Sequence, residues 1–180
     1  RSLSSAASDV YKRQFIINGK KSMVLNAESA DKIIVVTRTS GSQVDKNGIS
    51  LFIVDATSEG VVKENFPTVD GLRASEITFE NVKVSSEALI GEKDKGFETF
   101  QAVVNDAILA LSAEAVGAME VLYKDTVEYT QQREQFDHAL SDFQVLQHRM
   151  VDMFMEYEQC KSLLFRATLE TVEDPDLAQR

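Results

Sequence analysis

Two long runs of helical periodicity, separated by a short polar segment, constrain this chain more than any other feature of its sequence. In the first run, over residues 95–131, apolar side chains recur every three or four positions, the pattern of one buried helical face: Phe97, Phe100, Val104, Ala107, Leu111, Ala115, Ala118 and Leu122. At 1.5 Å per residue such a helix would be about 50 Å long, more than a small domain needs for its own core. We therefore expect it to pack against another subunit or domain.

The second run predicts another amphipathic helix, which continues to about Val172. Its apolar stripe consists of Phe143, Leu146, Met150, Met153, Tyr157, Cys160 and Leu164. Ser141, followed three residues later by Gln144, predicts a capping box at its start. Two such helices with a short polar connection, residues 129–147, are typical of an antiparallel pair.

The region before the helices has the two-residue period of β-strands. We predict a hairpin over residues 15–26, turning at Asn18-Gly19, because this dipeptide tolerates the positive φ angles of a type I′ turn. Further strands are predicted at residues 33–39, 49–55, 60–64 and 76–84. The strands at 33–39 and 49–55 are apolar enough for burial on both faces. The fold class predicted is therefore α+β: an antiparallel β sandwich or barrel followed by part of an up-down helical bundle.

The sequence predicts a division of the chain into three segments. Residues 1–14 are rich in Ser and Ala and basic at their end, so we expect a non-native leader outside the fold. Residues 15–93 would form the β domain, incomplete at its N-terminus, and residues 94–180 a partial helical bundle. Because two helices alone cannot bury both sides of their stripes, we expect the chain to be a fragment of a larger protein.

Composition excludes several classes of partner. The 19 Lys and Arg residues against 29 Asp and Glu residues give a formal charge of −10, which argues against binding of nucleic acid or anionic lipid. The single Cys160 cannot form an internal disulfide, and its spacing predicts a small buried hydrophobe, so we expect a reducing, cytoplasmic location. No apolar run approaches the roughly 18 residues of a membrane span, so none is expected.

A search for reactive motifs assigns no catalytic residue and no metal site. Glycine loops of the GxxxxGK and GxGxxG types are absent, and His138 and His148 lack partners at zinc-binding spacing. Glu114 lies on or beside the first apolar stripe, where burial would raise its pKa toward that of a usable base. The alternative for Glu114 is a partly buried carboxylate satisfied by a neighbouring Arg or a backbone group.

The polar connection contains a combination of side chains suited to a dinucleotide such as FAD. A guanidinium pairs with phosphate oxygens, an aromatic ring lies against a purine, and amides donate to ring or phosphate oxygens. The candidates for these roles are Arg133, Gln135, Phe136, Gln144, Gln147 and His148. The alternative is a solvated turn in which Phe136 plugs the junction of the two helices.

Several separated motifs together resemble the acyl-CoA dehydrogenase family over nearly all of residues 15–167. They are FIINGKKSMVLN at 15–26, NGISLFIVDATSEG at 47–60, VDGLRASEITFENVKV at 69–84, the helix entry at 89–97 with Gly117, and REQF at 133–136 followed by Gln144 in FQVLQHR. More narrowly, KSMVLNAESADKIIVVTRTSG, FPTVDGLRAS, AEAVGAMEVL and FQVLQHRMVDMF look most like the small-subunit branch typified by pimeloyl-CoA dehydrogenase.

The resemblance implies a flavoprotein of fatty acid metabolism, usually a tetramer whose long C-terminal helices pack together. Carried over by position, Arg133 would hold the FAD pyrophosphate of a neighbouring subunit and Phe136 would pack near its adenosine half. Gln144 would donate a hydrogen bond to the same cofactor. Met23 and Leu25 would lie along the isoalloxazine ring of a flavin.

The reaction implied is α,β-dehydrogenation of an acyl-CoA thioester, in which a carboxylate takes the α-proton and the β-hydrogen leaves as hydride to the flavin. In most members that carboxylate would lie beyond Arg180, and in some it occupies the position of Ala107. The fragment itself is therefore expected to be inactive. Electron-transfer flavoprotein is the electron acceptor that the resemblance implies, and the C-terminal helices would form a homo- or hetero-oligomer.

Five positions depart from the family pattern. Met23 stands in place of Trp, Leu25 in place of Thr, and Asp137 in place of the Gly after Phe136. Asn105 and Ile108 occupy positions where many members carry Asp and Arg. These departures motivate an alternative function: a non-catalytic partner subunit of a heteromeric acyl-CoA dehydrogenase that binds no flavin itself.

Overall fold

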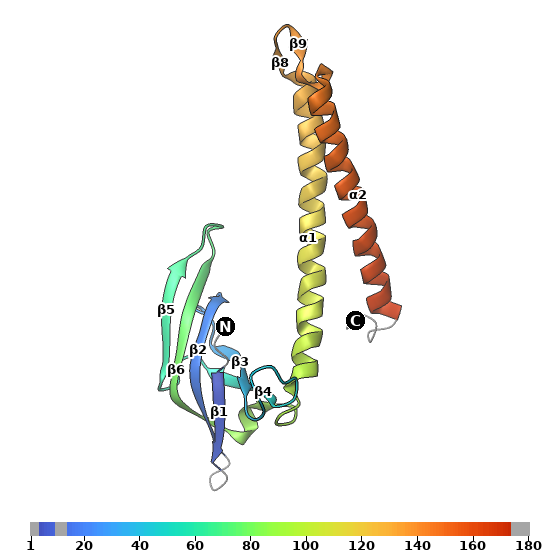
Figure 1. Ribbon diagram of the computed structural model, residues 1–180. Coiled ribbons are helices and arrows are strands. Elements are labelled where there is room, and N and C mark those ends of the chain that lie inside the picture. Colours follow the sequence, from blue (N-terminus) through green and yellow to red (C-terminus); the bar gives the residue numbers. More distant parts are fainter. Residues whose placement is uncertain (1–3, 10–13, 174–180) are drawn as a thin grey trace. The chain divides into compact units, whose positions relative to one another are not determined.

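The computed structural model describes residues 4–9 and 14–173, and the chain divides into two compact units, residues 1–100 and 101–180. The first unit contains one sheet with the strand order β5-β6-β2-β1-β3-β4-β7 (Figure 1). Its strands are β1 (Ser4–Asp9), β2 (Gln14–Leu25), β3 (Lys32–Arg38), β4 (Ile49–Asp55), β5 (Val61–Pro67), β6 (Arg73–Ser85) and β7 (Leu89–Ile90), with the 3-10 turn η1 (Ser86–Ala88) before β7. All neighbouring pairs are antiparallel except β1 with β3.

The core of this unit lies between its β2–β6 half and its β3–β4 half. The Phe15 and Phe52 rings, one from each half, have centroids 4.8 Å apart. Around them pack Ile17, Val35, Val54, Ile77, Phe79 and Val82, each at most 1% exposed. Strand β4 is buried on both faces as predicted, whereas β3 alternates and leaves Ile34 65% exposed.

The hairpin predicted over residues 15–26 is wrong. β2 is one continuous strand paired with β6, and the register shifts between Ile17 and Gly19, where Asn18 alone faces Glu80 and Asn81 of β6. The extra residue of this bulge therefore belongs to β6, and the Asn81 backbone N–H, in a residue with a φ angle of 53°, donates a hydrogen bond to Asn18 Oδ1 at 2.8 Å. The long pairing with β6 outweighed the turn preference of Asn18-Gly19.

Strand β1 falls within the segment that was predicted to lie outside the fold. Ser5–Asp9 pair antiparallel with β2, and Ser4 and Ser5 pair parallel with β3. Residues 1–3 and 10–13 lie outside the described part of the chain. That residues 1–14 are a non-native leader stays a prediction.

The second unit consists of most of α1 (Gly96–Gln132) and all of α2 (Gln144–Glu173), which run antiparallel side by side (Figure 1). Between them lie β8 (Glu134–Gln135), β9 (His138–Ala139) and the 3-10 turn η2 (Leu140–Asp142). The Tyr123 ring of α1 contacts Phe154 and Tyr157 of α2, with centroids 5.6 and 5.4 Å away. Both predicted helices are therefore present, within three residues of their predicted starts.

The apolar stripe predicted for α2 is confirmed as its α1-facing side, where Tyr157 is only 3% exposed. Cys160 is an exception, since it is exposed rather than buried. The stripe predicted for α1 is not the row that meets α2, although its member Ala115 lines the groove between the helices, and its expected packing against another subunit or domain stays a prediction. Leu111 and Leu122 are 64% and 61% exposed, because α1 meets α2 through a different row of residues: Leu109, Val116, Met119, Tyr123 and Thr130.

Helix α1 is unusually apolar for a helix with so much exposed surface. An 18-residue window within it has a mean hydropathy of 1.4 and no residue buried in this chain. By length and composition alone α1 could cross a membrane, the one such helix among the described residues. The central helix of a soluble bundle passes the same test, so the expectation that no span is present stays a prediction.

Candidate functional site

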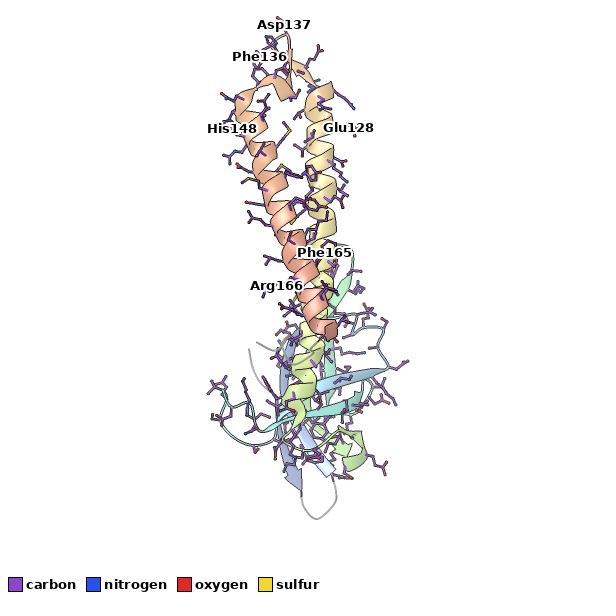
Figure 2. All side chains as sticks on the ribbon, turned by 90° about the vertical axis from the view of Figure 1, so that its right-hand side faces the viewer. Glu128, Phe136, Asp137, His148, Phe165 and Arg166 are labelled. Carbon is purple, nitrogen blue, oxygen red and sulfur yellow. The ribbon has the colours of Figure 1, made fainter. Side chains whose placement is uncertain are left out.

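The connection between the two helices is a two-residue β-hairpin with Phe136 and Asp137 at its tip (Figure 2). Glu134 pairs with Ala139 and Gln135 with His138 across it. Phe136 and Asp137 have φ angles of 57° and 62°, the positive values at both central residues that define a type I′ turn. We call residues 133–140 the hairpin tip.

Backbone hydrogen bonds anchor the hairpin tip to the end of α1. The Arg133 N–H donates to the Tyr129 carbonyl at 2.9 Å, and the Leu140 N–H donates to the Arg133 carbonyl at 2.8 Å. The tip is thus closed at its base as well as along its strands. A side chain at the tip is presented in a defined direction and not on a free loop.

Phe136 does not plug the junction of the helices. Its ring is 85% exposed, and its contact within the chain is an edge-on approach to Phe143, with centroids 6.3 Å apart. The alternative in which Phe136 fills the interhelical junction is therefore wrong. An aromatic ring held out into solvent on a closed turn is available to a ligand or to another subunit.

Arg133 and Gln144 are also exposed, and the hairpin brings both to the same end of the helical pair. Among the residues that the structure describes, the Arg133 guanidinium forms no ion pair, so its donors remain available for an anion. Gln144 is the first residue of α2. The Phe143 carbonyl accepts the Gln147 N–H at 3.1 Å, so Phe143 occupies the N-cap position and the capping box predicted at Ser141 is wrong.

Acidic side chains share the hairpin tip with Arg133. Glu134 and Asp137 are both exposed, and the Asp142 carboxylate lies 3.8 Å from His138 Nδ1, a contact that becomes an ion pair when His138 is protonated.

Met23 and Leu25 lie in the first unit, near the end of β2. Met23 has a φ angle of 54° at a second register shift, between Lys21 and Val24, and the two side chains are 58% and 62% exposed. Beside them Lys20 Nζ lies 2.6 Å from Glu76, and this hydrogen-bonded pair lowers the pKa of the Glu76 carboxyl and raises that of Lys20. Both apolar side chains are accessible to a planar ligand.

Glu114 does not behave as expected for a buried base. It is exposed on α1, as is Ala107, and it does not line the groove toward α2. Within residues 4–9 and 14–173 no cluster of three His, Cys, Asp or Glu residues could hold a metal ion.

The sequence analysis missed a groove between α1 and α2. It has a volume of about 620 Å³, and its largely apolar lining includes Leu109, Val116, Met119, Cys160 and Leu164. The predicted stripes contained part of the groove lining, since Cys160 and Leu164 belong to the α2 stripe and Ala115 to the α1 stripe. The other α1 residues of the groove were not in the predicted stripe.

Two family models cover nearly the whole chain. The acyl-CoA dehydrogenase middle domain matches residues 1–82, and the acyl-CoA dehydrogenase C-terminal domain matches residues 94–178. The chain belongs to the acyl-CoA dehydrogenase family. Members of this family are FAD-dependent oxidoreductases that act on CH–CH bonds.

Curated relatives of the acyl-CoA dehydrogenase chain agree with this assignment. It is 33% identical over 156 residues to the 3-(aryl)acrylate reductase of Clostridium sporogenes and 31% identical over 162 residues to the short-chain-specific acyl-CoA dehydrogenase of Megasphaera elsdenii. These matches cover 85% and 88% of this chain but 41% and 42% of the relatives. A third relative, 30% identical over 85% of this chain and 41% of its own length, is subunit CarC of the caffeyl-CoA reductase–Etf complex of Acetobacterium woodii.

Solved structures of the family show the same fold. Butyryl-CoA dehydrogenase from Megasphaera elsdenii is 29% identical, with a TM-score of 0.81 over 95% of this chain and 45% of its own. PigA, solved with FAD and proline, is also 29% identical, with a TM-score of 0.87 over the same shares. The chain thus spans less than half the length of the relatives it matches.

Proposed function

We propose that this chain is part of an FAD-dependent acyl-CoA dehydrogenase that catalyses α,β-dehydrogenation of an acyl-CoA thioester. Family membership supports the reaction class. The observation that carries the proposal is the closed hairpin tip, which holds Phe136 85% exposed and includes Arg133, whose guanidinium forms no ion pair among the described residues.

The exposed residues fit a flavin dinucleotide at two separate places. At the hairpin tip, Arg133 would pair with the pyrophosphate, Phe136 would cover the adenosine half, and Gln144 would donate to the same molecule, which belongs to a neighbouring subunit. On β2, Met23 and Leu25 would lie along the ring system of a flavin. When bound, the flavin supplies the hydride acceptor, whereas the proton-abstracting carboxylate comes from outside this chain, since Ala107 has no titratable group.

The test is to purify the full-length protein alone and titrate it with FAD. We expect a flavin absorption band and a dissociation constant that Arg133→Ala raises about tenfold to a hundredfold, the range for losing a charge-assisted hydrogen bond. Arg166→Ala is the matched control, because Arg166 lies on α2 away from the hairpin tip (Figure 2) and pairs with Glu170 at 2.7 Å. Equal FAD affinity for wild type and Arg133→Ala would contradict the assignment of the site.

The second candidate is the non-catalytic partner subunit, favoured by the Asp137 carboxylate at the tip and by Ala107 at a position where some members carry the base. That the chain belongs to the small-subunit branch typified by pimeloyl-CoA dehydrogenase is a separate, narrower proposal. The partner-subunit candidate predicts that the protein purified alone is colourless and becomes yellow only when combined with another subunit. A yellow protein that oxidises an acyl-CoA by itself would refute it.

Oligomerisation, the electron acceptor and the location of the protein are also proposals. The exposed apolar row on α1, which includes Leu111 and Leu122, supports assembly through the C-terminal helices. The relative CarC, named as a subunit of a complex with Etf, supports electron-transfer flavoprotein as the acceptor. A cytoplasmic location rests on the lone Cys160.

A further inference from the structure

Asp137 is unfavourable to the conformation of the hairpin tip. A type I′ turn favours glycine at its second central residue, because positive φ angles bring the Cβ of other residues close to the backbone. Here that residue is Asp137, at 62°, and it follows the bulky Phe136 at 57°. The turn is held by its flanking pairs and by the hydrogen bond between Leu140 N–H and the Arg133 carbonyl, against the preferences of its own two residues.

The negative charge of Asp137 also opposes binding of a negatively charged ligand such as FAD. Its carboxylate is exposed next to Phe136, and within the described part of the chain no cation lies within 4.0 Å of it. A pyrophosphate drawn to Arg133 would meet the field of a carboxylate in the same hairpin tip, one that no cation of the described residues neutralises. The repulsion acts through solvent, so salt weakens it.

We propose that Asp137 sets the flavin affinity of this site, keeping it low enough for FAD to exchange freely with solution. The inference rests on the proposed function. Two effects act together: the carboxylate repels the pyrophosphate, and backbone strain lowers the fraction of tips that hold the binding-competent turn. An affinity constant scales with that fraction, so relieving the strain tightens binding without adding a contact.

Two substitutions at this position separate charge from strain. Asp137→Asn removes the charge and keeps a residue that tolerates positive φ, whereas Asp137→Gly removes both the charge and the strain. Glu156→Gln is the matched control, since it removes one exposed negative charge more than three turns along α2 from Gln144 and leaves the turn unchanged. Circular dichroism of each variant verifies that the helical content is retained.

The experiment measures FAD dissociation constants of the full-length protein and the three variants by flavin fluorescence, at low and at high salt. We expect Asp137→Asn to bind about threefold to fivefold more tightly at low salt, with the gain shrinking at high salt. Asp137→Gly is expected to gain about fivefold more, a gain that persists at high salt. Glu156→Gln is expected to change the constant by less than about twofold.

Unchanged affinities at position 137, with FAD bound by wild type, would overturn this inference and leave the proposed function standing. A gain in Glu156→Gln equal to that in Asp137→Asn would also overturn it, because net charge and not Asp137 would then set the affinity. If no variant binds FAD, the proposed function and this inference fall together.

Discussion

The two units of this chain bury their apolar side chains to very different extents. In the β unit Ile17, Phe52, Ile77 and Phe79 are at most 1% exposed. In the helical unit the buried residues among those described are Tyr157 and Thr130, while more than a dozen large apolar side chains lie on the surface. The difference teaches that the β unit completes its own core, whereas the helical pair needs further elements to cover it.

The largest expected effect comes from truncating the β core. Phe52→Ala should lower the free energy of unfolding of the β unit by about 3–5 kcal/mol, because a buried phenyl ring leaves a cavity behind. Leu111→Ala, on the exposed face of α1, should cost less than about 0.5 kcal/mol at concentrations where the chain is monomeric. Hydrogen exchange of the β3 and β4 amides measures the loss of stability in Phe52→Ala, and exchange of the α1 amides measures the loss in Leu111→Ala. Equal losses in the two variants would show that the two units do not differ as described.

A smaller effect is expected at the one buried aromatic residue of the helical pair. The Tyr157 hydroxyl interacts with Lys161, raising the pKa of the Lys161 ammonium group, and contributes to lowering the pKa of Glu120, for which Lys124 is the main cause. Tyr157→Leu should destabilise the pair by about 1–2 kcal/mol, because it removes the ring contact with Tyr123, whose centroid lies 5.4 Å away. Tyr129→Leu is the control, since Tyr129 is 60% exposed. Thermal unfolding that separates neither variant from wild type would argue against a structured interhelical core.

The smallest expected effect is the pH dependence of a polar contact in the β unit. Hydrogen bonds from the hydroxyls of Thr39, at 2.5 Å, and Ser40, at 2.8 Å, lower the pKa of the Asp94 carboxyl below its ordinary 3.8. A carboxyl whose pKa is lowered by folding stabilises the folded state above its ordinary pKa and loses this contribution as pH falls through the lowered value.

The stability difference between wild type and Asp94→Asn should therefore be constant from about pH 5 to 8 and shrink below about pH 4. Asp106→Asn, on α1, serves as the control. Chemical denaturation at pH 7 and pH 3 measures the difference, and a difference that grows toward acid would contradict the sign of the shift.

Periodicity predicted the elements of this chain better than their partners. The bounds of β4 could be predicted from its run of apolar, β-prone residues, and those of both long helices from apolar side chains repeating every three or four residues. The face of α1 that meets α2 did not follow, because α1 is apolar on more than one side and a one-dimensional pattern does not say which side the neighbour covers. The prediction placed Leu111 on the buried face and left Met119 off it. In the structure Leu111 is exposed and Met119 is half-buried.

Turn chemistry was the weaker guide to the candidate site. Asn18-Gly19 has the ideal sequence for a type I′ turn and lies inside a continuous strand, whereas Phe136-Asp137 has a poor one and forms the turn. In each case long-range pairing or closure of the flanking segments outweighed the preference of the dipeptide. The residue types at 133–144 could suggest a nucleotide site, but the outward direction of Phe136 could not be derived without the turn.

Closure of the hairpin tip at its base has a consequence for how homologous sequences vary. The Leu140 N–H to Arg133 carbonyl bond and the pairing of Glu134 with Ala139 leave room for two tip residues and no more. An inserted or deleted residue would break this closure and move the start of α2 along α1. Sequence alignments across this turn should therefore show substitutions but no gaps.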